Sequence, residues 1–331
     1  MDQGILSTIG NTPLIRLDRV LKGAPFNLFA KLEGFNPGGS IKDRPAINII
    51  RRAMKSGAIT PQTTIIESSS GNMGIGLAQV CSYLGLRFIC VVDQKTTRQN
   101  IRLLETYGAE VDVITHSDLH GRDFLGARID RVLELLSKVK NSFCPNQYAN
   151  EANSDAHHQT MYEIAMALDG KVDYLFCATS TCGTIRGCAE YAHENGLRTR
   201  VYAVDAIGSV IFGSHKADRL IPGHGAAIRP ALYREDMADK VIRVSDLDCV
   251  VGCRRLAGTE AMLAGGSSGA VLTAVDQTKD EISAGANCVM IFPDRGERYL
   301  DTIYSDEWVA EHFGDIAHLW ETPEELLVGA A

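Results

Sequence analysis

Short apolar segments alternate along the chain with longer segments in which apolar residues recur every three or four positions. The short segments are typical of buried strands, and the recurring pattern is typical of amphipathic helices. In the first half of the chain they predict strands at Thr63–Ser68, Arg87–Asp93 and Glu110–Thr115, each followed by a helix, at Met73–Leu84, Gln99–Tyr107 and Phe124–Val139. Strands that alternate with helices in this way predict a parallel sheet with helices on both faces.

A second run of the same kind follows the polar loop Asn146–Asn153. It predicts a helix at Ala156–Leu168 and strands at Val172–Ala178, Arg200–Ala206, Val241–Val244 and Cys288–Phe292; two short strands, Asn11–Leu17 and Asn27–Leu32, precede the first run. Without an internal repeat or a flexible linker, the two runs predict an α/β protein with two doubly wound open sheets. We expect its functional site in the cleft between them.

Composition narrows the function classes. The chain has 331 residues and a net charge of −8, and its basic residues form no cluster, which argues against a nucleic-acid partner. No apolar run approaches membrane-spanning length, and Met1–Gly4 lacks the features of a signal peptide. The nine cysteines are scattered without C-x-x-C pairs, so reduced thiols are expected rather than disulfides or a zinc site. Together these features predict a cytoplasmic protein that binds neither nucleic acid nor membranes.

Asn36–Arg44 predicts an irregular loop that turns abruptly into a helix, because Asn-Pro and Gly-Gly break regular structure. Ser40 is a good N-cap, and Asp43 three residues later completes a capping box. Lys42 would then lie in the first helical turn, where the positive end of the helix dipole disfavours an ammonium group and lowers its pKa. A lysine whose neutral form is accessible suits Schiff-base chemistry, although a surface lysine on a capped helix would have the same local sequence.

Two further loops have the composition of anion-binding turns. Glu67–Gly74 and Thr179–Thr184 each follow a predicted strand, are rich in small polar residues, and lead into a predicted helix. Such turns present backbone N–H groups and a helix dipole to an anion. The first could bind a carboxylate, with Asn72 as a directional donor, and the second resembles a phosphate loop without the P-loop lysine. Either could also be an ordinary capped turn.

Three other segments carry alternative interpretations. Gly265–Gly269 formally matches the G-x-S-x-G motif of serine hydrolases, but that motif needs a preceding buried strand, whereas Arg254–Leu263 has a helical pattern. We therefore expect Ser267 to be a hydrogen-bond partner for a heteroaromatic nitrogen. The polar segment Asn146–Asn150 could line a substrate site or cap helices. His157-His158 invites a metal interpretation, but adjacent helical residues point apart, so no metal site is expected.

Lys42 with its flanking residues, the Ser69–Asn72 loop, the Ser180–Thr184 loop and Ser267 form one recognisable set. On these residues the chain resembles the cysteine synthase family of fold-type II pyridoxal-phosphate enzymes, whose fold is tryptophan synthase β-like. The resemblance extends over essentially the full length, from the Gly-Asn-Thr-Pro-Leu motif that begins at Gly10 to the Gly-Glu-Arg-Tyr-Leu motif that begins at Gly296. It implies pyridoxal 5′-phosphate as the cofactor and a homodimeric assembly.

The resemblance also implies roles for individual residues. Lys42 matches the lysine that forms the Schiff base with the cofactor, Asn72 matches the partner of the cofactor's 3′-oxygen, and Ser267 matches the partner of its pyridine nitrogen. The phosphate loop would consist of Ser180, Thr181, Cys182, Gly183 and Thr184. The substrate carboxylate would be bound by Ser69, Ser70, Gly71 and Met73 on one side and by Gln147 and its neighbour Tyr148 on the other.

The implied domains are a smaller one, residues 37–147, with the Schiff-base lysine and the carboxylate loop, and a larger one, residues 1–36 plus 148–331, with the phosphate loop. Two departures from cysteine synthases bear on the second substrate. Met73 stands where those enzymes usually have threonine, and the segment Gly223–Pro230 replaces their glycine-rich segment. Both departures put sulfide as the nucleophile in doubt.

Within the family the chain looks most like a branch that makes a precursor of L-2,3-diaminopropionate for siderophores and antibiotics. The resemblance then implies β-replacement: O-phospho-L-serine loses phosphate to give a bound aminoacrylate, and the amino group of L-glutamate adds to its β-carbon. A neutral Ser267 at the pyridine nitrogen would favour elimination over racemisation or transamination. Lys42 would act as general base. Two acidic substrates need at least one arginine fork, for which Arg128 and Arg229 are the candidates.

Other functions remain open at the level of sequence. A cysteine synthase, or a relative that uses sulfite or another small nucleophile, would share the same cofactor residues. A serine hydrolase would instead use Ser267 as its nucleophile. A non-catalytic binding protein on the same scaffold would not need Lys42.

Overall fold

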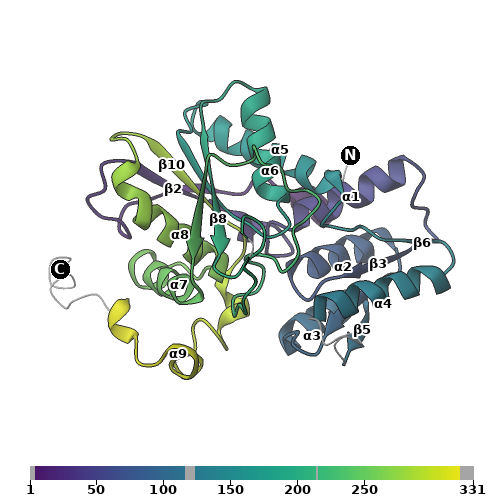
Figure 1. Ribbon diagram of the computed structural model, residues 1–331. Helices are drawn as coiled ribbons and strands as arrows, with labels where there is room; N and C mark the ends of the chain where they lie inside the picture. Colours follow the sequence, from purple (N-terminus) through teal and green to yellow (C-terminus); the bar gives the residue numbers. More distant parts are fainter. Residues whose placement is uncertain (1–3, 116–123, 214, 321–331) are drawn as a thin grey trace.

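The computed structural model describes residues 4–115, 124–213 and 215–320, and within them the strands form two separate sheets (Figure 1). The larger sheet has six strands in the order β1-β2-β10-β7-β8-β9. These are β1 (Leu14–Leu17), β2 (Asn27–Leu32), β7 (Tyr174–Ala178), β8 (Arg200–Ala206), β9 (Lys240–Val244) and β10 (Asn287–Phe292). The strands pair in parallel except for β1, which runs antiparallel to β2 at the edge of the sheet.

The smaller sheet is parallel, with the order β5-β4-β3-β6. Its strands are β3 (Thr64–Ser68), β4 (Phe88–Asp93), β5 (Glu110–Ile114) and β6 (Ser142–Phe143). The helices are α1 (Asp43–Lys55), α2 (Asn72–Leu84), α3 (Arg98–Thr106), α4 (Phe124–Lys138), α5 (Glu151–Ala167), α6 (Gly183–Glu194), α7 (Asp246–Glu260), α8 (Gly266–Thr278) and α9 (Asp306–Phe313).

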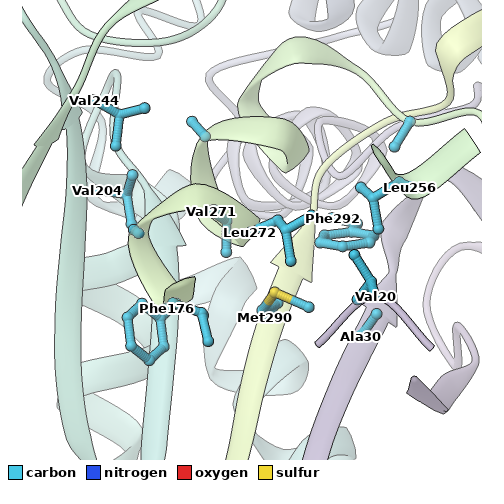
Figure 2. Close-up of a cluster of buried hydrophobic side chains, with 14 of the residues drawn as sticks. Val20, Ala30, Phe176, Val204, Val244, Leu256, Val271, Leu272, Met290 and Phe292 are labelled. Carbon is cyan, nitrogen blue, oxygen red and sulfur yellow. The ribbon is translucent and has the colours of Figure 1, made fainter. Parts of the chain in front are cut away.

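Alternate residues of each central strand enter different cores, because successive strand side chains point to opposite faces. In β10, Met290 and Phe292 pack with α7 and α8 in the core drawn in Figure 2, whereas Val289 and Ile291 pack with α5 and α6. In the smaller sheet, one face packs against α1 and α2, and the other against α4. Both sheets are therefore covered on two faces, as the strand–helix alternation predicts.

One boundary differs from the sequence-based prediction. The loop expected to end at Asn153 ends earlier, because the Asn150 side chain accepts a hydrogen bond from Ala152 N (3.0 Å) and α5 begins at Glu151. Every strand of the smaller sheet lies inside residues 37–147 and every strand of the larger sheet lies outside it. The division of the chain into two domains at those boundaries stays a prediction.

A buried ion network fixes helix α1 to the larger sheet. Arg44 pairs with Glu33 (Nε–Oε2, 2.7 Å) and with Glu163 of α5 (Nη2–Oε2, 2.7 Å), and Lys31 of β2 bonds the same Glu163 oxygen at 2.6 Å. All four side chains are buried, so removing one would leave uncompensated charge at a cost of about 3–5 kcal/mol. Because Arg44 lies two residues after Lys42, the network also fixes the segment that carries Lys42.

In the part of the chain that the structure describes, no helix is long and apolar enough to cross a membrane. All nine cysteines lie in this part and are free thiols, eight of them buried.

Candidate active site

Lys42 lies where the loop after β2 enters α1, but the predicted capping box is wrong. The helix begins at Asp43, with Lys42 itself at the N-cap position and without a side-chain cap. The Ser40 hydroxyl accepts a hydrogen bond from Lys42 N (3.2 Å), and the Asp43 carboxylate accepts one from Gly38 N (2.5 Å). Ser40 instead forms an isolated β-bridge with Asp294, so the segment before the helix is held by the end of β10.

The predicted fall in the pKa of Lys42 is confirmed, with a different main cause. Burial of the ammonium group lowers its pKa to about 8, while the Cys182 thiol and the Asp294 carboxyl act in the opposite direction. The residue is nevertheless only partly buried, so a ligand can reach it. The two opposing groups also show what surrounds Lys42: the Ser180–Thr184 loop on one side and the end of β10 on the other.

Helix N-termini near Lys42 differ from those elsewhere. Helices α1, α2, α6 and α8, which begin at the four predicted site segments, have no side-chain cap. Helices α3, α5, α7 and α9 are each capped by a threonine, asparagine or serine side chain. Uncapped first turns leave backbone N–H groups to be satisfied by other partners, and anions are favoured there. In α1, however, the first N–H groups are already used, because Asp43 N and Arg44 N donate to Ser40 O and Ile41 O (3.3 Å each). The ends of α2, α6 and α8 can therefore offer anion-binding N–H groups to one region.

The predicted phosphate loop connects β7 to α6. Cys182 has φ 67°, a left-handed conformation that turns the chain sharply into the helix. The Asn153 side chain of α5 donates to Thr181 Oγ1 (3.2 Å) and to Gln147 O (2.7 Å). A side chain at Gly183 would overlap that amide, because its Cβ would lie 2.2 Å from Asn153 Oδ1. The loop is thus closely packed against α5, and a side chain at Gly183 would not fit.

His157 completes the support of this loop. It is fully buried, with Nδ1 3.2 Å from Thr160 Oγ1 and Nε2 3.3 Å from Thr184 Oγ1. Burial lowers the pKa of His157 well below its usual value, and the charge of Lys42 acts in the same direction. His157 is therefore a neutral structural residue, whereas its neighbour His158 faces Glu190 on α6 (3.4 Å).

The predicted carboxylate loop connects β3 to α2. The Ser69 hydroxyl accepts a hydrogen bond from Gly74 N (2.9 Å), and the carbonyl of Ser70 accepts one from the Asn100 amide (3.0 Å). Nothing in the described protein lies within 4 Å of a Cβ built at Gly71, so its backbone faces open space. The Met73 side chain is 2% exposed and packs in the core of the smaller sheet. Met73 can therefore reach a substrate only through its backbone.

Glu67 lies beneath this loop and joins it to the segment that holds Gln147 and Tyr148. Its two carboxylate oxygens accept hydrogen bonds from Ser68 N (2.9 Å) and Gln147 N (3.4 Å). Burial raises the pKa of Glu67 to about 7, against the hydrogen bonds and the charge of Arg128. Gln147 is buried and Tyr148 is partly exposed.

The two candidate arginines differ in placement. Arg128 of α4 is largely buried behind β4, with its Nε 3.4 Å from Asp93 Oδ2. Its Nε and Nη1 make no hydrogen bond within the described part of the chain. Arg229 is exposed and stacks over the Tyr233 ring (4.8 Å), although its charge still acts on the Cys182 thiol.

Ser267 is in the first turn of α8, after a short extended segment that has one β-bridge, Ala264 to Arg295. In the described structure the element directly before α8 is helix α7 and not a strand, so the geometry of a hydrolase nucleophile elbow is missing. The segment Gly223–Pro230 lies against the phosphate loop, since Gly225 N donates to Thr179 O (2.7 Å). The replacement noted in the sequence is therefore next to the site.

Several residues that support the site were not singled out from the sequence: Glu67, Asn153, Asp294 and Arg298. Glu67 had a visible signal, a carboxylate at the end of the apolar strand β3. The other three act through partners far away along the chain.

These side chains fit a phosphorylated aldehyde such as pyridoxal phosphate. They supply a buried amine of lowered pKa at Lys42, an uncapped helix end at Gly183 for the phosphate, and neutral hydroxyls at Ser180 and Ser267.

Comparison with known proteins agrees with that chemistry. A family model described as pyridoxal-phosphate dependent enzyme matches residues 5–294. The chain therefore belongs to the pyridoxal-phosphate dependent enzymes, with the fold-type II architecture, and its cofactor is pyridoxal phosphate.

Three individual proteins are similar to the chain over most of its length. The chain is 46% identical over 309 residues to N-(2-amino-2-carboxyethyl)-L-glutamate synthase of Ralstonia nicotianae, a match that covers 93% of this chain and 91% of that protein. It is also similar to the crystal structures of cysteine synthase from Entamoeba histolytica (TM-score 0.86, 32% identity, 92% of this chain and 91% of that one) and of a hydrogen sulfide-producing enzyme from Fusobacterium nucleatum (TM-score 0.84, 33% identity, 91% and 98%).

Proposed function

We propose that the protein catalyses a pyridoxal-phosphate dependent β-replacement in which the amino group of L-glutamate displaces phosphate from O-phospho-L-serine. The product is N-(2-amino-2-carboxyethyl)-L-glutamate, a precursor of 2,3-diaminopropionate for siderophore or antibiotic synthesis. The product, and with it L-glutamate as the nucleophile, is supported by the similarity to the Ralstonia nicotianae synthase. Phosphate as the leaving group is part of the proposal.

The observation that carries this proposal is the set of uncapped ends of α2, α6 and α8 near Lys42. The cofactor phosphate and the carboxylates and phosphate of these two substrates are all anions, and the chain as a whole is acidic. Local helix ends and single arginines must therefore bind them. We assign the cofactor phosphate to Ser180–Thr184 and the carboxylate of the first substrate to Ser69–Gly71, with Gln147 and Tyr148 on its other side.

Arg128 is the better candidate for the substrate phosphate. A buried guanidinium with unused donors near the carboxylate loop is expected to bind a doubly charged group strongly. Arg229, which is exposed and stacked on Tyr233, is better placed for the more distal carboxylate of the second substrate.

Bound pyridoxal phosphate supplies the electron sink for loss of the β-substituent. Asn72 would donate to its 3′-oxygen, and Ser267, which carries no charge, would bond its ring nitrogen. Lys42 Nζ would hold the cofactor, take the α-proton from the first substrate and return a proton to the product. With a pKa of about 8, a substantial fraction of this amine is neutral near physiological pH.

We further propose that residues 37–147 and the remainder of the chain are separate domains that bind the two substrates between them. The protein would function as a cytoplasmic homodimer.

The test is a spectrum of the purified protein followed by titration with O-phospho-L-serine and then with L-glutamate. We expect the first substrate to change the cofactor absorbance, with phosphate released, and glutamate but not sulfide to restore it; mass spectrometry would identify the product. Reversal by sulfide alone would contradict the proposed nucleophile and indicate a cysteine synthase. Alanine at both Arg128 and Arg229 with unchanged affinity for both substrates would contradict their roles.

A further inference from the structure

The segment that follows β10, Pro293–Tyr299, contacts two of the site helices at once. The backbone N–H of Ile41, next to Lys42, donates to Pro293 O (2.7 Å), and that of Gly265, which precedes α8, donates to Asp294 O (3.3 Å). Asp294 is therefore placed between the segment that carries Lys42 and the helix that carries Ser267. Its side chain is 4% exposed.

The Asp294 carboxylate and the Arg298 guanidinium both bond Asn72. Asn72 Nδ2 donates to Asp294 Oδ2 (2.7 Å), and Arg298 Nη1 donates to Asn72 Oδ1. Tyr299 donates its hydroxyl to the same carboxylate oxygen at 2.6 Å. The reverse orientation of the amide would place its oxygen against the carboxylate and its nitrogen against the guanidinium, so the two charged groups determine the orientation.

From this geometry we propose that Asp294 and Arg298 are positioning residues for the cofactor, because they fix the Asn72 amide with its nitrogen toward the site. An amide nitrogen has two N–H groups, and Asp294 takes one of them. The other is then presented to the 3′-oxygen of the cofactor. The inference rests on the proposed role of Asn72 and is independent of which substrates the enzyme uses.

Further contacts restrict both residues. A side chain at Gly265 would bring its Cβ within 1.9 Å of Asp294 Oδ1, so only glycine fits there. Arg298 also donates from Nη2 to Gly38 O (2.5 Å), in the loop before Lys42. One arginine therefore fixes both Asn72 and that loop relative to the larger sheet.

The experiment uses the cofactor-loaded protein without substrates, with Asp294→Asn and Arg298→Met as the test variants. We expect each to weaken cofactor binding about tenfold, the usual effect of losing a hydrogen bond to a charged group, and to shift the absorption band of the bound cofactor. Arg295→Met is the matched control, because Arg295 is in the same segment but is exposed and pairs only with Glu297 among the described residues. It should change neither quantity.

The same variants made in an Asn72→Ala protein distinguish a positioning role from a general loss of structure. If Asp294 and Arg298 act through Asn72, their effects on cofactor binding and on the spectrum should largely disappear when Asn72 is already alanine. Undiminished effects in that background, or a parental spectrum and affinity in both single variants, would overturn the inference. Tyr299→Phe, which removes one hydrogen bond to the carboxylate, gives a milder variant with a smaller shift in the same direction, in case the first two fold poorly.

The experiments distinguish failure of the proposed function from failure of the positioning role of Asp294 and Arg298. A parent enzyme that prefers sulfide to glutamate would overturn the proposed substrates but leave these substrate-free measurements unchanged.

Discussion

The two βα turns of the site have the same layout and opposite electrostatic surroundings. Around the turn from β7 to α6, two buried groups that contact or form the loop stay neutral near pH 7: burial keeps His157 uncharged and raises the pKa of the Cys182 thiol to about 12. Around the turn from β3 to α2, burial brings pKa values close to neutrality, to about 7 for Glu67 and, beside Lys42, to about 7 for Asp43.

The difference matches what each turn is proposed to bind. A cofactor phosphate that remains bound through every turnover is best held by backbone donors and neutral side chains, whose strength does not vary with pH. A substrate that must enter, lose a proton and leave is handled where groups titrate near the working pH. The pH dependence of the enzyme should therefore originate at the β3–α2 side and at Lys42.

The largest effect is expected for Lys42→Ala. Removing the proposed base and cofactor anchor should lower kcat by at least about a thousandfold and abolish covalent attachment of the cofactor, measured by its absorbance and by mass after borohydride reduction. Lys55→Ala, at the exposed end of the same helix, is the control and should behave like the parent. A substantially active Lys42→Ala enzyme would contradict the role of Lys42 as base and cofactor anchor.

Glu67→Gln should change how stability depends on pH. In the cofactor-free protein the pKa of Glu67 is raised from 4.5 to about 7, so its contribution is fully present below about pH 4.5 and is lost as pH rises toward 7. A shift of this size corresponds to about 3 kcal/mol in the free energy of unfolding. Denaturant titrations from pH 4.5 to 8 should show a shallower decline in the variant, and Asp43 should account for part of what remains. An identical decline would show that Glu67 does not titrate in this range.

Glycine-to-alanine changes should separate the two turns by stability. Gly183→Ala would overlap Asn153, so we expect a loss of about 2 kcal/mol and weaker cofactor binding. Gly71→Ala meets no atom of the described residues and should leave the melting temperature unchanged while it weakens substrate binding. Thermal melts of the two cofactor-free variants test the stability difference. Equal destabilisation would contradict it.

The smallest effect is expected for His157→Phe. Replacing the ring without its nitrogens leaves the hydroxyls of Thr160 and Thr184 without this partner, so cofactor affinity should fall about tenfold or less. The pH profile of kcat should keep its shape, because His157 is neutral throughout. His158→Phe, at the neighbouring position facing Glu190, controls for the added bulk. A displaced pH profile in His157→Phe alone would place a titrating group at the phosphate loop.

The sequence was sufficient for most strands and helices, because each of them is determined by its own residues and by the periodicity that burial imposes. Phe88–Asp93 and Arg200–Ala206, for example, have few polar interruptions and are strands in the structure. The short strand β6 and helix α9 were not predicted. The start of α1 was wrong because Ser40, locally a good N-cap, pairs with Asp294, which is far away along the chain. The residues around Ser40 in the sequence give no sign of this pairing with Asp294.

The same reasoning explains which parts of the site could be predicted. Lys42, Asn72, the Ser180–Thr184 loop and Ser267 lie at or near helix starts whose existence their own neighbours indicate, even where the exact first residue, as in α1, depends on a distant partner. The structure gathers these segments around the end of β10. Asn153 and Arg298 act only through residues brought together by folding, so no spacing in the sequence identifies them. The binding roles of Arg128 and Arg229 stay predictions, although their different burial now distinguishes them.

The nine free thiols have a practical consequence. Burial raises the pKa of most of them, Cys144 and Cys182 included, so little thiolate is available at neutral pH. Maleimide reagents should therefore react slowly with the native chain. A single cysteine introduced at an exposed position such as Lys55 could therefore carry a fluorescent or spin label without prior removal of the others.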